Sequence, residues 1–158
     1  MATVENGLYR TTIPHPLEAA QIPAGRLVYV GRQGGSPFVV VPHHNEQNRW
    51  FWQEPTTPLG DDDWNASLLR LPSEGFYTLP RTLEFDAGGK WLKNAIVQLG
   101  YDRTGSGIIF VAERYHNSED NALFFSDRGH RIEDDLLFEL QWAPILPVSE
   151  SNEGAIVH

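Results

Sequence analysis

The chain has 158 residues, of which 41% are hydrophobic and 21% charged, and its formal net charge at pH 7 is −9. This composition is typical of a globular protein and excludes long disorder, a coiled coil and collagen-like repeats. An acidic surface repels the phosphates of nucleic acids and of anionic membranes, so we expect neither as a partner. The length predicts a single domain, 1–148, followed by a polar tail, 149–158.

The chain contains no cysteine, which excludes disulfides, thiolate nucleophiles and cysteine-ligated metal centres. Its first residues lack the basic and apolar stretches of a secretory signal, so a cytoplasmic location is expected. The longest apolar runs, such as 38–41, have only four or five residues, too few to span a bilayer. Glycine-rich phosphate-binding motifs are also missing from the sequence, and no cofactor is expected.

Alternating apolar and polar residues between Gly, Pro, Asn and Asp predict short strands in the N-terminal half. These strands are expected at 8–13, 25–31, 38–41, 49–53 and 67–71, with one helical turn at 17–21. The run of four apolar residues at 38–41 predicts burial on both faces of that strand. Gly34 and Gly35 predict a tight hairpin turn before it. The segment 54–63, rich in Pro and Asp, is expected to be a loop.

The same reasoning predicts strands in the C-terminal half at 76–79, 82–85, 90–101, 108–114 and 122–126, with turns at 86–89, 102–107, 117–121 and 127–130. In the long strand 90–101, alternation places Val97, Leu99 and Tyr101 on one face, together with Ala95. The segment 135–143 is predicted to be a strand. A helix at 132–140 is the alternative, because its apolar residues also fit helical spacing.

Together these elements predict an all-β protein of about nine to eleven strands, with at most one or two short helical turns. Turns recur every ~8–12 residues, which is typical of an antiparallel β-sandwich or a β-barrel. The strand order, and the choice between these two architectures, stay open. A division into two domains at 54–63 is less favoured, because each half would be small for an independent core.

Five tryptophans are the most unusual feature of the composition. In the strand 49–53, Trp50 and Trp52 are expected on one face and Phe51 on the other. Exposed aromatic faces beside charged residues bind proteins or sugar rings, whereas buried ones fill a core. The candidate binding residues are Arg49, Trp50, Trp52, Asp61, Asp62, Asp63 and Trp64.

A metal site is a separate hypothesis. His43, His44 and Glu46 follow the strand 38–41, and His116 follows the strand 108–114. Imidazoles and a carboxylate at the strand ends of a barrel can bind Zn, Fe or Mn. Successive side chains of a strand point to opposite faces, so at most one of His43 and His44 is expected to face a barrel interior. The histidine spacing also differs from the cupin pattern.

Other catalytic patterns are weak. Ser106 lies between two glycines but lacks the strand–turn–helix context of a nucleophile elbow, and the carboxylate runs are expected on solvated loops. The sequence therefore favours a non-enzymatic protein that acts by contact with another protein or with a second copy of itself, such as an assembly, accessory or immunity-type protein. The alternative is a domain that binds a carbohydrate or a small apolar ligand. A metal-dependent, cupin-like barrel enzyme is the third and least favoured hypothesis.

Overall fold

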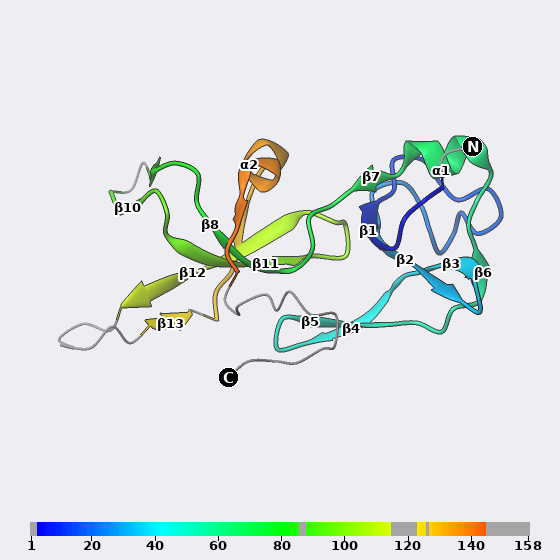
Figure 1. Ribbon diagram of the computed structural model, residues 1–158, viewed down its shortest axis with the longest axis horizontal. Coiled ribbons are helices and arrows are strands. Elements are labelled where there is room, and N and C mark those ends of the chain that lie inside the picture. Colours follow the sequence, from blue (N-terminus) through cyan, green and yellow to red (C-terminus); the bar gives the residue numbers. More distant parts are fainter. Residues whose placement is uncertain (1–2, 86–87, 115–122, 126, 145–158) are drawn as a thin grey trace, which may run out of the picture.

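The computed structural model describes residues 3–85, 88–114, 123–125 and 127–144. Fifteen strands and two short helices occupy these ranges, which confirms the all-β class and the short helices. Two antiparallel sheets lie at opposite ends of an elongated molecule (Figure 1). Within the described ranges neither sheet closes into a barrel. The two helices found there are too short and too polar to cross a lipid bilayer.

The N-terminal sheet has the strand order β6-β3-β2-β1-β7. Its strands are β1 (Gly7–Arg10), β2 (Leu27–Gln33), β3 (Ser36–Val40), β6 (Thr57–Pro58) and β7 (Leu69–Arg70). The predicted hairpin between β2 and β3 is confirmed, because Gly34 and Gly35 have φ values of 57° and 84°, which a tight two-residue turn requires. The sheet buries Val28, Val30 and Val39 in an N-terminal cluster that also contains Trp64.

The prediction that 54–63 is entirely a loop was wrong at its C-terminal end. Helix α1 (Asp62–Ser67) begins there, and the Asp61 side chain accepts a hydrogen bond from the Trp64 N–H at 2.9 Å. Such a cap satisfies one of the free N–H groups at a helix N-terminus. The helix has only six residues, too few for its apolar periodicity to be visible in the sequence.

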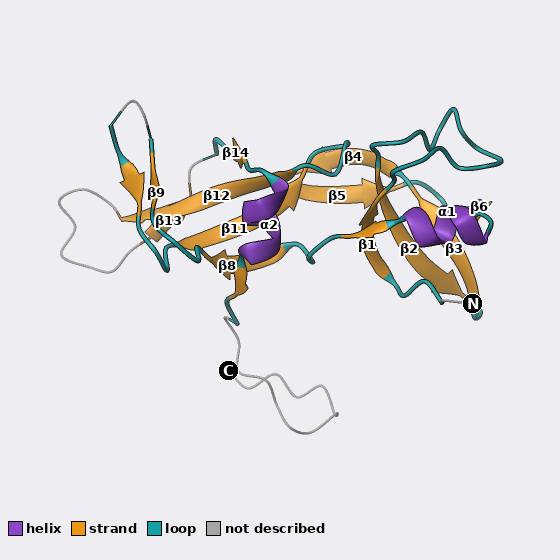
Figure 2. Ribbon diagram, turned by 90° about the horizontal axis from the view of Figure 1, so that it is seen from above, coloured by secondary structure: helices purple, strands orange, loops and turns teal. Residues whose placement is uncertain are grey.

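The C-terminal sheet has the strand order β13-β12-β11-β8-β15, and β14 also pairs with β12. Its strands are β8 (Gly75–Thr78), β11 (Ile96–Tyr101), β12 (Gly107–Arg114), β13 (Leu123–Phe125), β14 (His130–Arg131) and β15 (Gln141–Trp142). Val97, Leu99 and Tyr101 lie on the buried face, as predicted. Helix α2 (Asp134–Glu139) covers this face with Leu136 and Leu137, and Figure 2 shows it lying over β11 and β8.

Two predicted strands of this half proved to be composite. The segment 90–101 contains β10 (Lys90–Trp91), which pairs with β9 (Leu83–Glu84), then a turn at Asn94 with a φ of 70°, and only then β11. The alternation breaks there, since Trp91 and Leu92 are both apolar and Lys93 and Asn94 both polar, and this break marks the turn. The segment 135–143 is mostly helix α2 followed by β15, so the helical alternative describes most of it, and Leu136 and Leu137 both lie on the buried side of the helix.

The remaining hairpin joins the two ends of the molecule. It consists of β4 (Pro42–Glu46), which the sequence did not predict, and β5 (Arg49–Trp52). The Trp50 Nε1–H donates to the Tyr101 carbonyl at 2.8 Å, so the hairpin lies against β11 (Figure 1).

The strand number exceeds the predicted nine to eleven partly because six strands have only two residues. The predicted turn 117–121 and tail 149–158 lie outside the described residues.

The two sheets share side chains between their cores. Leu27 of β2 is completely buried, yet it belongs to the C-terminal cluster around Val97 and Leu99 rather than to the N-terminal one. Leu8 of β1 and Leu71 pack in the same cluster. The inner strands of the N-terminal sheet therefore contribute to both hydrophobic clusters.

Candidate functional site

The tryptophans of β5 face inward. Trp50 and Trp52 are half-buried and pack against the C-terminal cluster, whereas Phe51 points outward, so the predicted alternation is observed. The guanidinium of Arg103 lies 5.2 Å from the Trp50 ring centroid, and that of Arg49 lies 5.5 Å from the Phe51 ring. The residue of β5 that offers an aromatic surface is therefore Phe51.

Trp64 is a core residue. Its side chain is completely buried, and the His15 ring contacts it edge-on at a centroid distance of 4.8 Å. Asp62 and Asp63 are exposed and line a hollow of about 530 Å³ next to Tyr9. Among the described residues around that hollow, Tyr9 alone is aromatic. The predicted group of Trp64 and three aspartates is thus divided between the core, a helix cap and the surface.

His15 is a fully buried polar residue that the sequence analysis did not single out. Its Nδ1 accepts hydrogen bonds from the Leu17 and Glu18 N–H groups, each at 3.2 Å. Nε2 lies 3.1 Å from the Pro58 carbonyl and donates to it in this tautomer. In the sequence, His15 stands between two prolines, and this could have indicated its place in an ordered loop. All the polar atoms of the ring are used to hold the 14–22 loop, so His15 has a structural role.

The two adjacent histidines lie side by side, contrary to expectation. A bulge between Pro42 and His44 breaks the alternation of β4, and the Nδ1 atoms of His43 and His44 lie 2.7 Å apart. Glu46 Oε1 is 3.6 Å from His44 Nε2. Within the described part of the chain, no group of three or more His, Asp or Glu side chains is arranged to hold a metal ion. His116 lies outside the described residues.

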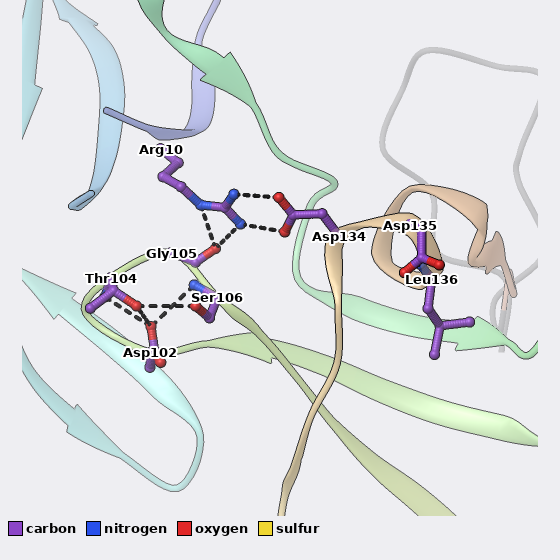
Figure 3. Close-up of polar contacts among 8 residues, drawn as sticks. All are labelled: Arg10, Asp102, Thr104, Gly105, Ser106, Asp134, Asp135 and Leu136. Atoms are coloured by element: carbon purple, nitrogen blue, oxygen red, sulfur yellow. Dashed lines mark hydrogen bonds and ion pairs between the residues drawn. The ribbon is translucent and has the colours of Figure 1, made fainter. Parts of the chain in front are cut away.

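A polar junction connects the two sheets (Figure 3). Arg10 of β1 binds both carboxylate oxygens of Asp134 at the start of α2 and donates to the Gly105 carbonyl in the β11–β12 turn. Asp102 orders that turn by accepting hydrogen bonds from the Thr104 and Ser106 N–H groups. The hydrogen bond raises the pKa of Arg10 and lowers that of Asp134. Both groups remain ionised at neutral pH, so the junction is a stable ion pair.

The loop between the sheets carries a buried carboxyl group. Glu74 Oε1 is buried without a hydrogen-bond partner among the described residues, and burial raises its pKa. Nearby, the hydroxyls of Tyr77 and Tyr101 donate to the Ser73 and Pro72 carbonyls, each at 2.6 Å. Burial raises the pKa of both tyrosines. The hydroxyls therefore stay protonated and hold the connecting loop.

Trp91 lies at the centre of an aromatic surface on the C-terminal half of the described structure. Two open grooves, of about 350 and 690 Å³, share a wall made by Phe85 and Trp91. The rings of these residues meet edge-on at a centroid distance of 4.5 Å, and His130 contacts Trp91 in the same way at 4.7 Å. We call this surface the Trp91 groove. The β9–β10 hairpin, β14 and the start of α2 supply its smaller side, and β10, β12 and the 92–95 turn supply its larger side.

Charged side chains form the rim of the Trp91 groove. On the smaller side, Arg81 pairs with Glu139 and with Asp135 at 3.9 Å, while Arg131 pairs with Asp102 at 2.6 Å. The larger side is bordered by Lys90, Lys93 and Glu113. Apolar surface is also exposed here, since Phe85 is 42% and Leu92 58% accessible.

Trp91 was not predicted as a site residue, because the sequence pattern placed it within one long strand. The available signal was the Gly88-Gly89 pair, which allows the chain to fold back so that Phe85 and Trp91 approach each other. Whether their rings are exposed or buried depends on what packs against the hairpin.

Comparison with protein-family models, curated proteins and solved structures finds no match to this chain. The fold and the site define an all-β protein with two larger antiparallel sheets, two two-stranded hairpins and an open, aromatic groove beside the C-terminal sheet.

Proposed function

We propose that the protein is a non-enzymatic binding module that holds a segment of another protein in the Trp91 groove. The observation that carries this proposal is the shared wall of Phe85 and Trp91 between two open grooves. An open groove suits an extended chain that passes across the surface, whereas small ligands are mostly enclosed.

The side chains of the wall are of the kind that dominates protein interfaces. Aromatic residues at the centre of an interface contribute most of its binding energy, and a polar rim surrounds them. Trp91 is half-buried and held by Phe85 and His130, so it presents a fixed surface and loses little side-chain entropy on binding. Leu92, exposed on the adjoining turn, extends the apolar surface.

A carbohydrate is the second candidate ligand. Glu133 and Asp135 line the smaller side of the groove, which Trp91 also lines. Aromatic rings together with a few polar groups suit the apolar faces and hydroxyls of sugars. This candidate uses the same wall, so the same variants test it.

The experiment is panning of a random peptide display library on the immobilised full-length protein, with a glycan array probed in parallel. We expect peptides whose affinity falls roughly tenfold or more in Trp91→Ala, because truncation of an interface hot spot costs ~2 kcal/mol. Trp142→Ala is the matched control, since Trp142 is 59% exposed on β15 and lies outside the groove.

Phe85→Ala is a second test variant in case Trp91→Ala does not fold. Phe85 is exposed, so its truncation disturbs the core less than that of Trp91. Circular dichroism establishes that each variant remains folded. Failure of both folded variants to weaken any selected peptide overturns the proposal. If glycans bind the wild type and lose affinity in Trp91→Ala, and no such peptide is found, the carbohydrate hypothesis is supported instead.

A further inference from the structure

The chain contains only two lysines, and both border the Trp91 groove. Lys90 precedes Trp91 on β10, and Lys93 follows it on the next turn. Both lysines are exposed, and both are among the residues that line the larger side of the groove. In a chain with 12 basic and 21 acidic residues, two cations therefore border the same groove as Trp91.

Neither lysine has an ion-pair partner in the described ranges, in contrast to several arginines. Arg10, Arg70, Arg81 and Arg131 each pair with a carboxylate. Two acidic residues of the described ranges are relevant: Glu84 is opposite Lys90 in the β9–β10 ladder, and Glu113 lines the same side of the groove as the lysines. Neither carboxylate forms an ion pair with a lysine, because its oxygens lie more than 4.0 Å from the lysine nitrogens.

The two sides of the groove therefore differ in charge. On the smaller side, Arg81 and Arg131 are paired with acidic residues. Among the described residues that line the larger side, two are lysines and one, Glu113, carries a carboxylate. Charges separated by more than ~8 Å are largely screened at physiological ionic strength, so a bound segment responds mainly to these local charges rather than to the net charge of the chain.

We propose that the segment held in the Trp91 groove is acidic. An apolar side chain of the segment packs on Phe85 and Trp91, and a neighbouring Asp or Glu carboxylate pairs with Lys90 and Lys93. A lysine ammonium is a compact charge that pairs with a carboxylate from many directions, which suits an extended segment. Complementary local charge gives the groove specificity for such a segment. This inference rests on the proposed function.

The test begins with the charge of the peptides selected on the full-length protein. We expect those that depend on Trp91 to contain more Asp and Glu than the unselected library. The tightest of them is then synthesised in two forms, one with its acidic residues and one with Asn and Gln in their place. Both are titrated against the wild type, the double variant Lys90→Gln/Lys93→Gln, and the control Arg49→Gln, an exposed arginine on β5.

The acidic peptide should bind the lysine double variant roughly fivefold more weakly, as expected for two exposed ion pairs, and the amide peptide should bind both proteins equally. Arg49→Gln should change neither affinity. Neutral or basic peptides that depend on Trp91, or equal losses for the acidic and amide forms, overturn this inference and leave the proposed function in place. If no peptide depends on Trp91 or Phe85, the proposed function fails and this inference with it.

Discussion

Arg10 and Asp134 lie 124 positions apart in the sequence and are joined by two hydrogen bonds of 2.7 and 2.8 Å. Arg10 belongs to the N-terminal sheet, and Asp134 is the first residue of α2, which covers the C-terminal sheet. The same guanidinium also donates to Gly105 in the β11–β12 turn (Figure 3). One side chain thus fixes the position of β1 relative to two elements of the other sheet.

Asp134→Asn should lower the free energy of unfolding at pH 7 by about 1 kcal/mol, the value typical of a well-aligned, partly exposed ion pair. The hydrogen bond to Arg10 lowers the pKa of Asp134 in the folded state. Its contribution is therefore complete above the unfolded pKa, near 3.8, and is lost as the pH falls through the lower folded value. Urea unfolding at pH 7 and at pH 3 measures the difference between wild type and variant at each pH.

Glu133→Gln is the matched control for that experiment, because Glu133 precedes Asp134 and its side chain makes no capping hydrogen bond. We expect it to change stability little at either pH. A difference between wild type and Asp134→Asn that is the same at both pH values would contradict the assigned ion pair.

Glu74→Gln should stabilise the protein at neutral pH. Burial raises the pKa of Glu74, and Oε1 has no hydrogen-bond partner in the described structure, so ionisation opposes folding. For a carboxyl with a raised folded pKa, stability falls as the pH rises from about the unfolded value of 4.5 through the folded one. Since the group is partly exposed, we expect a gain of about 1 kcal/mol or less.

The measurement is the free energy of unfolding of both proteins between pH 4 and pH 8. The advantage of Glu74→Gln should grow with pH and be small at pH 4, where the carboxyl is largely protonated. The exposed Glu84→Gln serves as the control. A variant that is less stable than the wild type at pH 8 would show that the carboxylate has a partner.

Trp64→Ala should lower the free energy of unfolding by about 3–5 kcal/mol, because it leaves a large cavity in the N-terminal cluster. Trp142→Ala, at a site that is 59% exposed, should cost less than ~1 kcal/mol. Chemical denaturation followed by circular dichroism compares the two. Near-wild-type stability of Trp64→Ala would mean that Trp64 does not have the core position assigned to it.

Asp61→Ala should cost about 1 kcal/mol through loss of the N-cap of α1. Asp63→Ala should cost less, because Asp63 lies in the first turn without being the N-cap and there favours the helix dipole, an effect of ~0.3–1 kcal/mol at exposed sites. Thermal unfolding of both variants ranks them. Equal effects would contradict the capping role and would return the acidic run to the candidate binding residues.

Local patterns in the sequence were sufficient for the fold class and for much of the secondary structure. The Gly34-Gly35 turn and the buried face of Val97, Leu99 and Tyr101 follow from backbone conformations and side-chain alternation within a few residues. Where those patterns failed, a short element interrupted them, as at Asn94 and in α1. A six-residue helix or a two-residue strand is stabilised by its neighbours rather than by its own sequence pattern.

The tertiary structure alone decided which aromatic side chains are buried and which are exposed. Trp64 and Trp91 both stand beside charged residues in the sequence, yet one lies completely within the N-terminal cluster and the other forms the wall of an open groove. The ion pair of Arg10 and Asp134 is equally invisible in the sequence. The physical reason is that burial and ion pairing depend on which surfaces meet across the fold, and those surfaces come from residues far apart in the chain.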